Sequence, residues 1–118
     1  MSVCEIRNTF HVIFGDVNMT RRENKFQADL IKEIKNRFEG CIVLKNDPNY
    51  IQGIPDLTIF HNDKWAALEC KDNAKAPHQP NQDYYISKMN NMSYASFIFP
   101  ENKEDVLNEL ERTLEPKK

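Results

Sequence analysis

The sequence predicts an α/β fold in which helices cover both sides of a mixed central sheet. Two observations support this class: short apolar runs typical of strands alternate with longer segments whose apolar residues recur every three or four positions. The expected order is helix, strand, hairpin of two strands, helix, strand, helix. A chain of 118 residues with only three glycines and no internal repeat favours a single domain, residues 1–118.

Within this domain we distinguish an N-terminal extension at 1–20, a core at 22–100 and a C-terminal helix at 102–115. The extension contains little information. Its apolar run at 10–14 is a candidate additional strand, and His11 within it is more typical of a packed or surface histidine than of a metal ligand.

The first helix is predicted over 22–38. Thr20 is a suitable N-cap, and Gly40 is a suitable stop after the C-terminus. Glu23 lies three residues before the first apolar position and should therefore lean toward the buried side. The alternative interpretation of Glu23 is an acid that interacts favourably with the helix dipole. The apolar stripe consists of Phe26, Leu30, Ile31, Ile34 and Phe38.

A continuous apolar run at 41–44 predicts the first core strand, and a polar, turn-prone connection follows it. Asp47 in this connection is expected to cap a turn. Gly53 indicates a place where the backbone passes close to substrate or metal, or a simple bend before the next strand. The segments 53–60 and 65–71 then form a hairpin around the polar turn at 61–64.

The hairpin brings ionisable side chains together. Pairing residues symmetrically about the turn sets Asp56 opposite Glu69, and directly opposed residues in an antiparallel pair share a face. Lys71 lies two residues beyond Glu69 and therefore joins the same face. We predict that these two carboxylates and one ammonium form a site. The alternative is a surface hairpin on which Glu69 and Lys71 form a solvated charge pair.

The residue types in this patch favour metal and phosphate chemistry. Two carboxylates about 4 Å apart repel by roughly 4 kcal/mol at an effective dielectric near 20. A hard divalent cation, Mg²⁺ above all, is the natural counter-charge. The Cys70 side chain should point into the core, which leaves its main-chain carbonyl between Glu69 and Lys71 as a candidate metal ligand. A lysine beside such a cation can orient water or neutralise developing charge.

The pattern Gly-x-Pro-Asp at 53–56, a hairpin, and Glu-x-Lys at 69–71 resembles the PD-(D/E)xK nuclease superfamily. The similarity is greater to the small stand-alone nucleases of the VRR-NUC and phage Holliday-junction-resolvase-like group, and it covers about residues 22–100. The resemblance implies a restriction-endonuclease-like core. It also implies that Glu23 completes the metal site, in a Glu-x-x-x-Gln setting that Gln27 reproduces.

After the hairpin we expect an irregular stretch with two prolines, a helix over 81–91, a strand over 94–99 and a last helix capped by Asn102. Gln82 should lie on the inward side of its helix, on the stripe of Tyr85, Met89 and Met92. A glutamine at this place resembles an auxiliary site residue of the family, although an ordinary polar helix start is the alternative. Candidate contacts to DNA phosphates are Arg21, Arg22, Lys25, Lys75, His78 and Lys88. For Lys75, His78 and Lys88 a solvated surface charge is the alternative.

The net charge of −2 is unlike that of a typical DNA-binding protein, but six of the acids lie in residues 101–118. Cys4, Cys41 and Cys70 are widely spaced and indicate reduced thiols rather than disulfides or a zinc site. No stretch approaches eighteen apolar residues, so we expect no membrane partner and a cytoplasmic location, in the host cytoplasm if the protein is phage-encoded.

The sequence therefore predicts a Mg²⁺- or Mn²⁺-dependent DNA endonuclease. Asp56 and Glu69 are its principal metal ligands, with Glu23 as a third, while Lys71 and Gln82 act on water and charge. Selectivity for branched DNA and a homodimer are compatible with the resemblance. The alternatives are a non-catalytic nucleic-acid-binding or regulatory protein on a retained nuclease fold, and a small structural or host-interaction protein.

Overall fold

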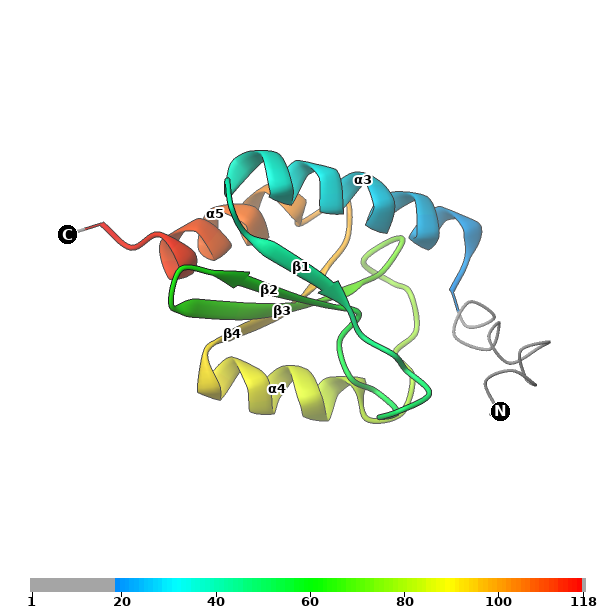
Figure 1. Ribbon diagram of the computed structural model, residues 1–118. Helices are drawn as coiled ribbons and strands as arrows, with labels where there is room; N and C mark the ends of the chain where they lie inside the picture. Colours follow the sequence, from blue (N-terminus) through cyan, green and yellow to red (C-terminus); the bar gives the residue numbers. More distant parts are fainter. Residues whose placement is uncertain (1–18, 118) are drawn as a thin grey trace, which may run out of the picture.

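A computed structural model describes residues 19–117, and the candidate strand at 10–14, His11 and Cys4 lie outside this part. The described chain forms a four-stranded sheet and three helices, in the predicted order (Figure 1). The elements are α3 (Arg21–Arg37), β1 (Ile42–Lys45), β2 (Leu57–His61), β3 (Lys64–Cys70), α4 (Gln82–Met92), β4 (Tyr94–Ile98) and α5 (Lys103–Leu114).

The sheet has the order β1-β2-β3-β4 and is mixed, as predicted. The pairs β1–β2 and β2–β3 are antiparallel. The pair β3–β4 is parallel, because α4 returns the chain to the end of the sheet at which β3 begins. Helices α3 and α5 lie side by side on one face, joined by an ion pair of 2.9 Å between Lys103 Nζ and Glu33 Oε1. Helix α4 covers the other face (Figure 1).

Helix α3 has the predicted N-cap, Thr20, which forms a complete capping box, and it begins one residue before the predicted start. The Thr20 hydroxyl accepts the Glu23 N–H at 2.9 Å, and Glu23 Oε1 accepts the Thr20 N–H at 3.2 Å. The helix buries Leu30 and Ile34, while Phe38 is its buried C-cap residue. Gly40 then adopts a φ of +89°, a left-handed conformation that favours glycine.

The core fills the space between the sheet and the α3/α5 layer. Alternate residues of β2 and β3 point into it, and the Cys70 side chain is among them, as expected from strand alternation. The four apolar residues predicted for the last helix are all buried there: Val106, Leu107, Leu110 and Leu114. Across residues 19–117, every helix is too short or too polar to cross a membrane.

Three local expectations differ from the structure. β1 is an edge strand with one open face, on which Ile42 is 58% and Leu44 47% exposed, so it is not buried on both sides. Met92 was expected on the inward side of α4 but is exposed, because it is the last residue of the helix. The Asn102 side chain accepts the Phe99 N–H at 2.8 Å instead of capping α5.

Candidate active site

The turn of the β2–β3 hairpin fixes the position of the predicted acid pair. A two-residue connection of Asn62 and Asp63 links the strands, and Asn62 has a φ of +58°, as tight hairpin turns require. The observed register pairs His61 with Lys64 and Leu57 with Leu68, so the predicted register is confirmed. One step further along the same register, the Asp56 N–H donates to Glu69 Oε1 at 3.2 Å.

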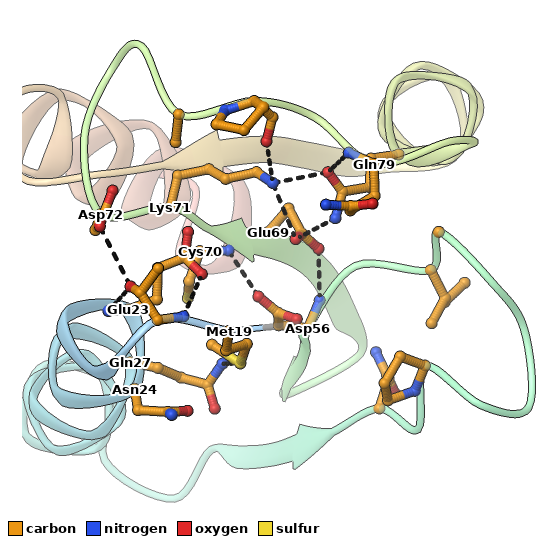
Figure 2. A pocket seen from close by; sticks show the side chains of 18 of the residues that line it. Met19, Glu23, Asn24, Gln27, Asp56, Glu69, Cys70, Lys71, Asp72 and Gln79 are labelled. Atoms are coloured by element: carbon orange, nitrogen blue, oxygen red, sulfur yellow. Dashed lines mark hydrogen bonds and ion pairs between the residues drawn. The ribbon is translucent and has the colours of Figure 1, made fainter. Parts of the chain in front are cut away.

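The Asp56 side chain is held by β3. Its Oδ2 accepts the main-chain N–H of Cys70 at 3.0 Å, so the carboxylate bridges from the start of β2 to the end of its neighbouring strand. The Glu69 side chain therefore accepts a hydrogen bond from the Asp56 main chain, and the Asp56 side chain accepts one from the main chain beside Glu69. Both carboxylates lie where β2 begins and β3 ends (Figure 2). The predicted convergence of the two acids is present.

Lys71 is 5% exposed and lies among polar partners (Figure 2). Its Nζ donates to Gln82 Oε1 at 2.8 Å and to the Pro77 carbonyl at 3.0 Å, and it lies 4.0 Å from Glu69 Oε2. Gln82 Nε2 in turn donates to Glu69 Oε2 at 2.8 Å. Gln82 thus connects the lysine and the glutamate with one amide, and the expectation that it faces inward is correct.

Gln82 reaches this position because it is the first residue of α4. Its Oε1 also accepts the Gln79 N–H at 2.8 Å, which ties the 71–81 connection to the helix start. The preceding residue, Asn81, has a φ of +72° and turns the chain sharply into the helix. An acceptor shared by a main-chain amide and an ammonium holds the side chain in one orientation.

Glu23 is buried at the start of α3, where its helix-terminus role is observed, while its role as a third metal ligand stays a prediction. Its Oε1 is engaged in the capping box, which is the helix-terminus role. Its charge also raises the pKa values of Asp56 and Glu69, so it lies within electrostatic reach of the acid pair. Gln27 is buried one turn later, and its Nε2 lies 4.0 Å from Met19 Sδ.

The acid pair is electrostatically unfavourable as two anions. Burial raises the pKa of Asp56 to about 6, although the Cys70 N–H and the Lys71 charge act in the opposite direction. Burial and then the Asp56 charge raise the pKa of Glu69 to about 8, with Lys71 again opposing. One lysine therefore does not supply enough positive charge for both carboxylates, and a cation or a proton would relieve the cluster.

These side chains open into one cavity of about 740 Å³. Its walls come from the start of α3, the end of β1 with the 46–56 connection, and the end of β3 with the 71–81 connection. Four carboxylates and three lysines line it, together with many amide side chains. The predicted residues that line it are Glu23, Gln27, Asp56, Glu69, Cys70, Lys71, Lys75 and Gln82.

The remaining phosphate-contact candidates lie outside the cavity wall. Arg21, Arg22 and Lys88 are exposed on their helices, and Lys25 pairs with Asp29 at 3.0 Å. His78 stacks on Phe97 with ring centroids 4.1 Å apart, and its Nδ1 lies 2.8 Å from the acceptor Asp83 Oδ1. A role of these side chains in DNA binding stays a prediction.

Lys45 and Asn46 belong to the site but were missed in the sequence. Lys45 pairs with Leu57 at the end of β1, lines the cavity and opposes the pKa rise of Asp56. Asn46 donates from Nδ2 to the Pro55 carbonyl at 2.9 Å and from its N–H to the Asp56 carbonyl at 2.8 Å. The only indication in the sequence was that Lys45 and Asn46 directly follow the apolar run of β1. That position does not reveal that β1 pairs with β2 and so lies beside Asp56.

Within 19–117 there is no group of three histidine, cysteine, aspartate or glutamate side chains close enough together to hold a metal ion. Asp56 and Glu69 form a pair, with the Cys70 main chain between Glu69 and Lys71 in the cavity wall. Mg²⁺ typically uses one or two carboxylates and keeps several waters, so this pair fits its ordinary ligand set.

No protein-family model matches the chain, and comparisons with curated proteins and with solved structures found no match either. The resemblance to PD-(D/E)xK nucleases therefore rests on the residues and on the geometry of the hairpin end described above.

Proposed function

We propose that this protein is a metal-dependent DNA endonuclease with a restriction-endonuclease-like core, similar to the small VRR-NUC and phage Holliday-junction-resolvase-like nucleases. The observation that carries the proposal is the convergence of the half-buried Asp56 with the buried Glu69 and Lys71 at one end of a hairpin, opening into a cavity. A solvated surface pair would be exposed, whereas Glu69 is 4% exposed. Buried charges with strongly shifted pKa values in a cavity are typical of functional sites.

Mg²⁺ or Mn²⁺ is the proposed cofactor. Asp56 and Glu69 would hold it, with the Cys70 carbonyl and Glu23 as further candidate ligands. The raised pKa values of both carboxylates support this assignment, because a divalent cation supplies the positive charge that the site lacks. When bound, such an ion polarises phosphoryl oxygens and makes water more acidic.

The protein residues then orient substrate and water. Lys71 has three N–H donors, of which Pro77 and Gln82 engage two, so one remains for a phosphate oxygen or the attacking water. Gln82 keeps the ammonium pointed at the Glu69 side of the cavity and adds no charge. Lys71 thereby neutralises negative charge that develops on the phosphoryl group.

DNA binding is proposed to be weak without the metal. The chain carries a net charge of −2, and the cavity contains more carboxylates than lysines. Lys75 at the cavity wall and the exposed Arg21, Arg22, Lys25 and Lys88 would contact phosphates. We expect low affinity for duplex DNA in EDTA, and tight metal-independent binding in a gel-shift experiment would contradict the proposal.

The decisive experiment incubates plasmid and four-way-junction DNA with Mg²⁺, Mn²⁺ or EDTA. Asp56→Ala and Lys71→Ala should abolish cleavage, because each removes one of the three charged groups that converge at the hairpin end. Asp63→Ala and Lys64→Ala are matched controls: the same residue types pair at 2.9 Å at the opposite end of the same hairpin. Activity that survives Asp56→Ala or Lys71→Ala would exclude the assignment.

The same preparations test the remaining proposals. Comparing junction with linear substrates tests the preference for branched DNA, and size-exclusion chromatography tests the homodimer. Titration calorimetry with Mg²⁺ separates a nuclease from a non-catalytic nucleic-acid-binding protein on the same fold, since the latter need not take up an ion at Asp56. The proposed cytoplasmic location follows from this activity on DNA.

A further inference from the structure

The connection between β1 and β2 forms a wall of the cavity and carries an unusually exposed aromatic residue. Tyr50 is 84% exposed, more than any other large apolar or aromatic residue in the described chain. Its neighbours Asn49 and Gln52 line the cavity. Tyr50 thus lies along the chain between two residues of the cavity wall, and its ring contributes almost nothing to the core.

The connection is fixed at both of its ends. Asn46 donates its N–H to the Asp56 carbonyl at 2.8 Å, so the two ends of the connection are tied to each other directly at the site. At the tip, Asp47 accepts the Asn49 N–H through Oδ1 at 2.8 Å and the Tyr50 N–H through its carbonyl at 3.1 Å. The predicted turn-capping role of Asp47 is thus confirmed.

The connection is also braced against α4. Gly53 has a φ of +90°, and a Cβ at this position would lie 2.5 Å from Asn81 Cβ. The backbone at Gly53 therefore passes close to Asn81, the residue that precedes Gln82, whereas the expected approach to substrate or metal stays a prediction. The turn therefore fixes the backbone at Tyr50 while the ring stays uncovered, which leaves a stacking surface open to a ligand.

We propose that Tyr50 stacks on an unpaired nucleobase adjacent to the phosphate in the cavity, which makes it a substrate-selecting residue; this inference rests on the proposed nuclease function. An aromatic ring can stack on a base only if one face of that base is free, whereas a duplex covers both faces. Amide side chains beside Tyr50, from Asn49 and Gln52, offer donors and acceptors to the base edge.

The test measures binding separately from cleavage. Fluorescence anisotropy in EDTA, at protein concentrations high enough to measure the weak metal-free binding, compares a short labelled DNA single strand with its duplex, for the full-length protein and for Tyr50→Ala and Tyr50→Phe. We expect Tyr50→Ala to weaken single-strand binding by about 5- to 100-fold and Tyr50→Phe to change it less than about twofold, with duplex binding unchanged. Tyr84→Ala is the matched control, since Tyr84 is 57% exposed on α4 and contacts Tyr85.

A strand of the same length with abasic positions adds a second readout, because loss of the base should remove the difference between the protein and Tyr50→Ala. The proposal is overturned if Tyr50→Ala binds the single strand normally, if it loses single-strand and duplex binding equally, or if no single-strand binding is measurable. These outcomes are independent of cleavage. Cleavage that requires Asp56, with no effect of Tyr50→Ala, would remove this inference and leave the nuclease assignment intact.

Discussion

Replacing Glu69 by glutamine should stabilise the metal-free protein at high pH while abolishing nuclease activity. The pKa of Glu69 is about 8 in the folded protein against its ordinary 4.5. Each unit corresponds to about 1.4 kcal/mol, so ionising Glu69 in the folded state costs on the order of 5 kcal/mol. The residue is 4% exposed, so solvent screening reduces this cost little.

The substitution has its own cost. Asp56 N–H and Gln82 Nε2 both donate to the Glu69 carboxylate, and a glutamine offers them a single oxygen. Losing one acceptor costs about 1–3 kcal/mol, which leaves a net gain of about 2–4 kcal/mol near pH 9. Near pH 6 Glu69 is neutral in the folded protein but ionised in the unfolded chain, so only about 2 kcal/mol of this cost applies. The lost acceptor offsets it, and the two proteins should differ by less than about 1 kcal/mol.

The direction with pH follows from linkage. A carboxyl whose pKa is raised on folding stabilises the native state at low pH, and this stabilisation is lost as the pH rises through the folded-state value. Urea unfolding in EDTA between about pH 6 and pH 9 measures the effect. Asp63→Asn, at the exposed end of the hairpin, is the control. A stability difference between Glu69→Gln and the unmodified protein that does not change with pH would refute the reasoning.

Three further predictions concern residues that support the site. Gln82→Ala removes a partner from both Lys71 and Glu69 and should lower stability by about 1–3 kcal/mol; in cleavage assays it should reduce kcat more than it raises KM, and an unchanged kcat would contradict its positioning role. Thr20→Ala breaks the capping box and should cost about 1 kcal/mol in thermal unfolding, whereas an unaltered Tm would mean that the cap is dispensable. Gly53→Ala should destabilise by more than about 2 kcal/mol, and more than Gly40→Ala, because both have positive φ but only Gly53 meets a neighbour; equal losses would show that backbone strain alone decides.

The hairpin could be predicted from sequence because its contacts are local. A two-residue turn and strand alternation are enough to place Asp56 opposite Glu69 and Cys70 in the core, and the structure has both. The capping residue Thr20 was also recognisable, since its partner Glu23 is only three residues away. In each case the sequence separation is short and one geometric rule determines the contact.

The contacts that were missed depend on strand order. An apolar run of four residues predicts a strand at β1, but only the sheet order β1-β2-β3-β4 makes it an edge with Ile42 and Leu44 exposed. The same order brings Lys45 to Asp56 across a long connection. The hydrogen bonds of Gln82 depend on how the 71–81 connection folds back, and no local periodicity encodes that path.

The two-residue length of the hairpin turn has a consequence for how this chain can vary. A slip of the β2–β3 pairing by one residue would turn each side chain of β3 to the opposite face of the sheet. The Cys70 thiol would then point into the cavity, and Glu69 would point into the hydrophobic core under α3 and α5. Insertions or deletions that shift the pairing by an odd number of residues are thus incompatible with the acid pair. Shifts by an even number keep each side chain on its own face of the sheet. The number of residues in the turn at Asn62 and Asp63, far from any reacting group, therefore determines whether the two carboxylates can meet.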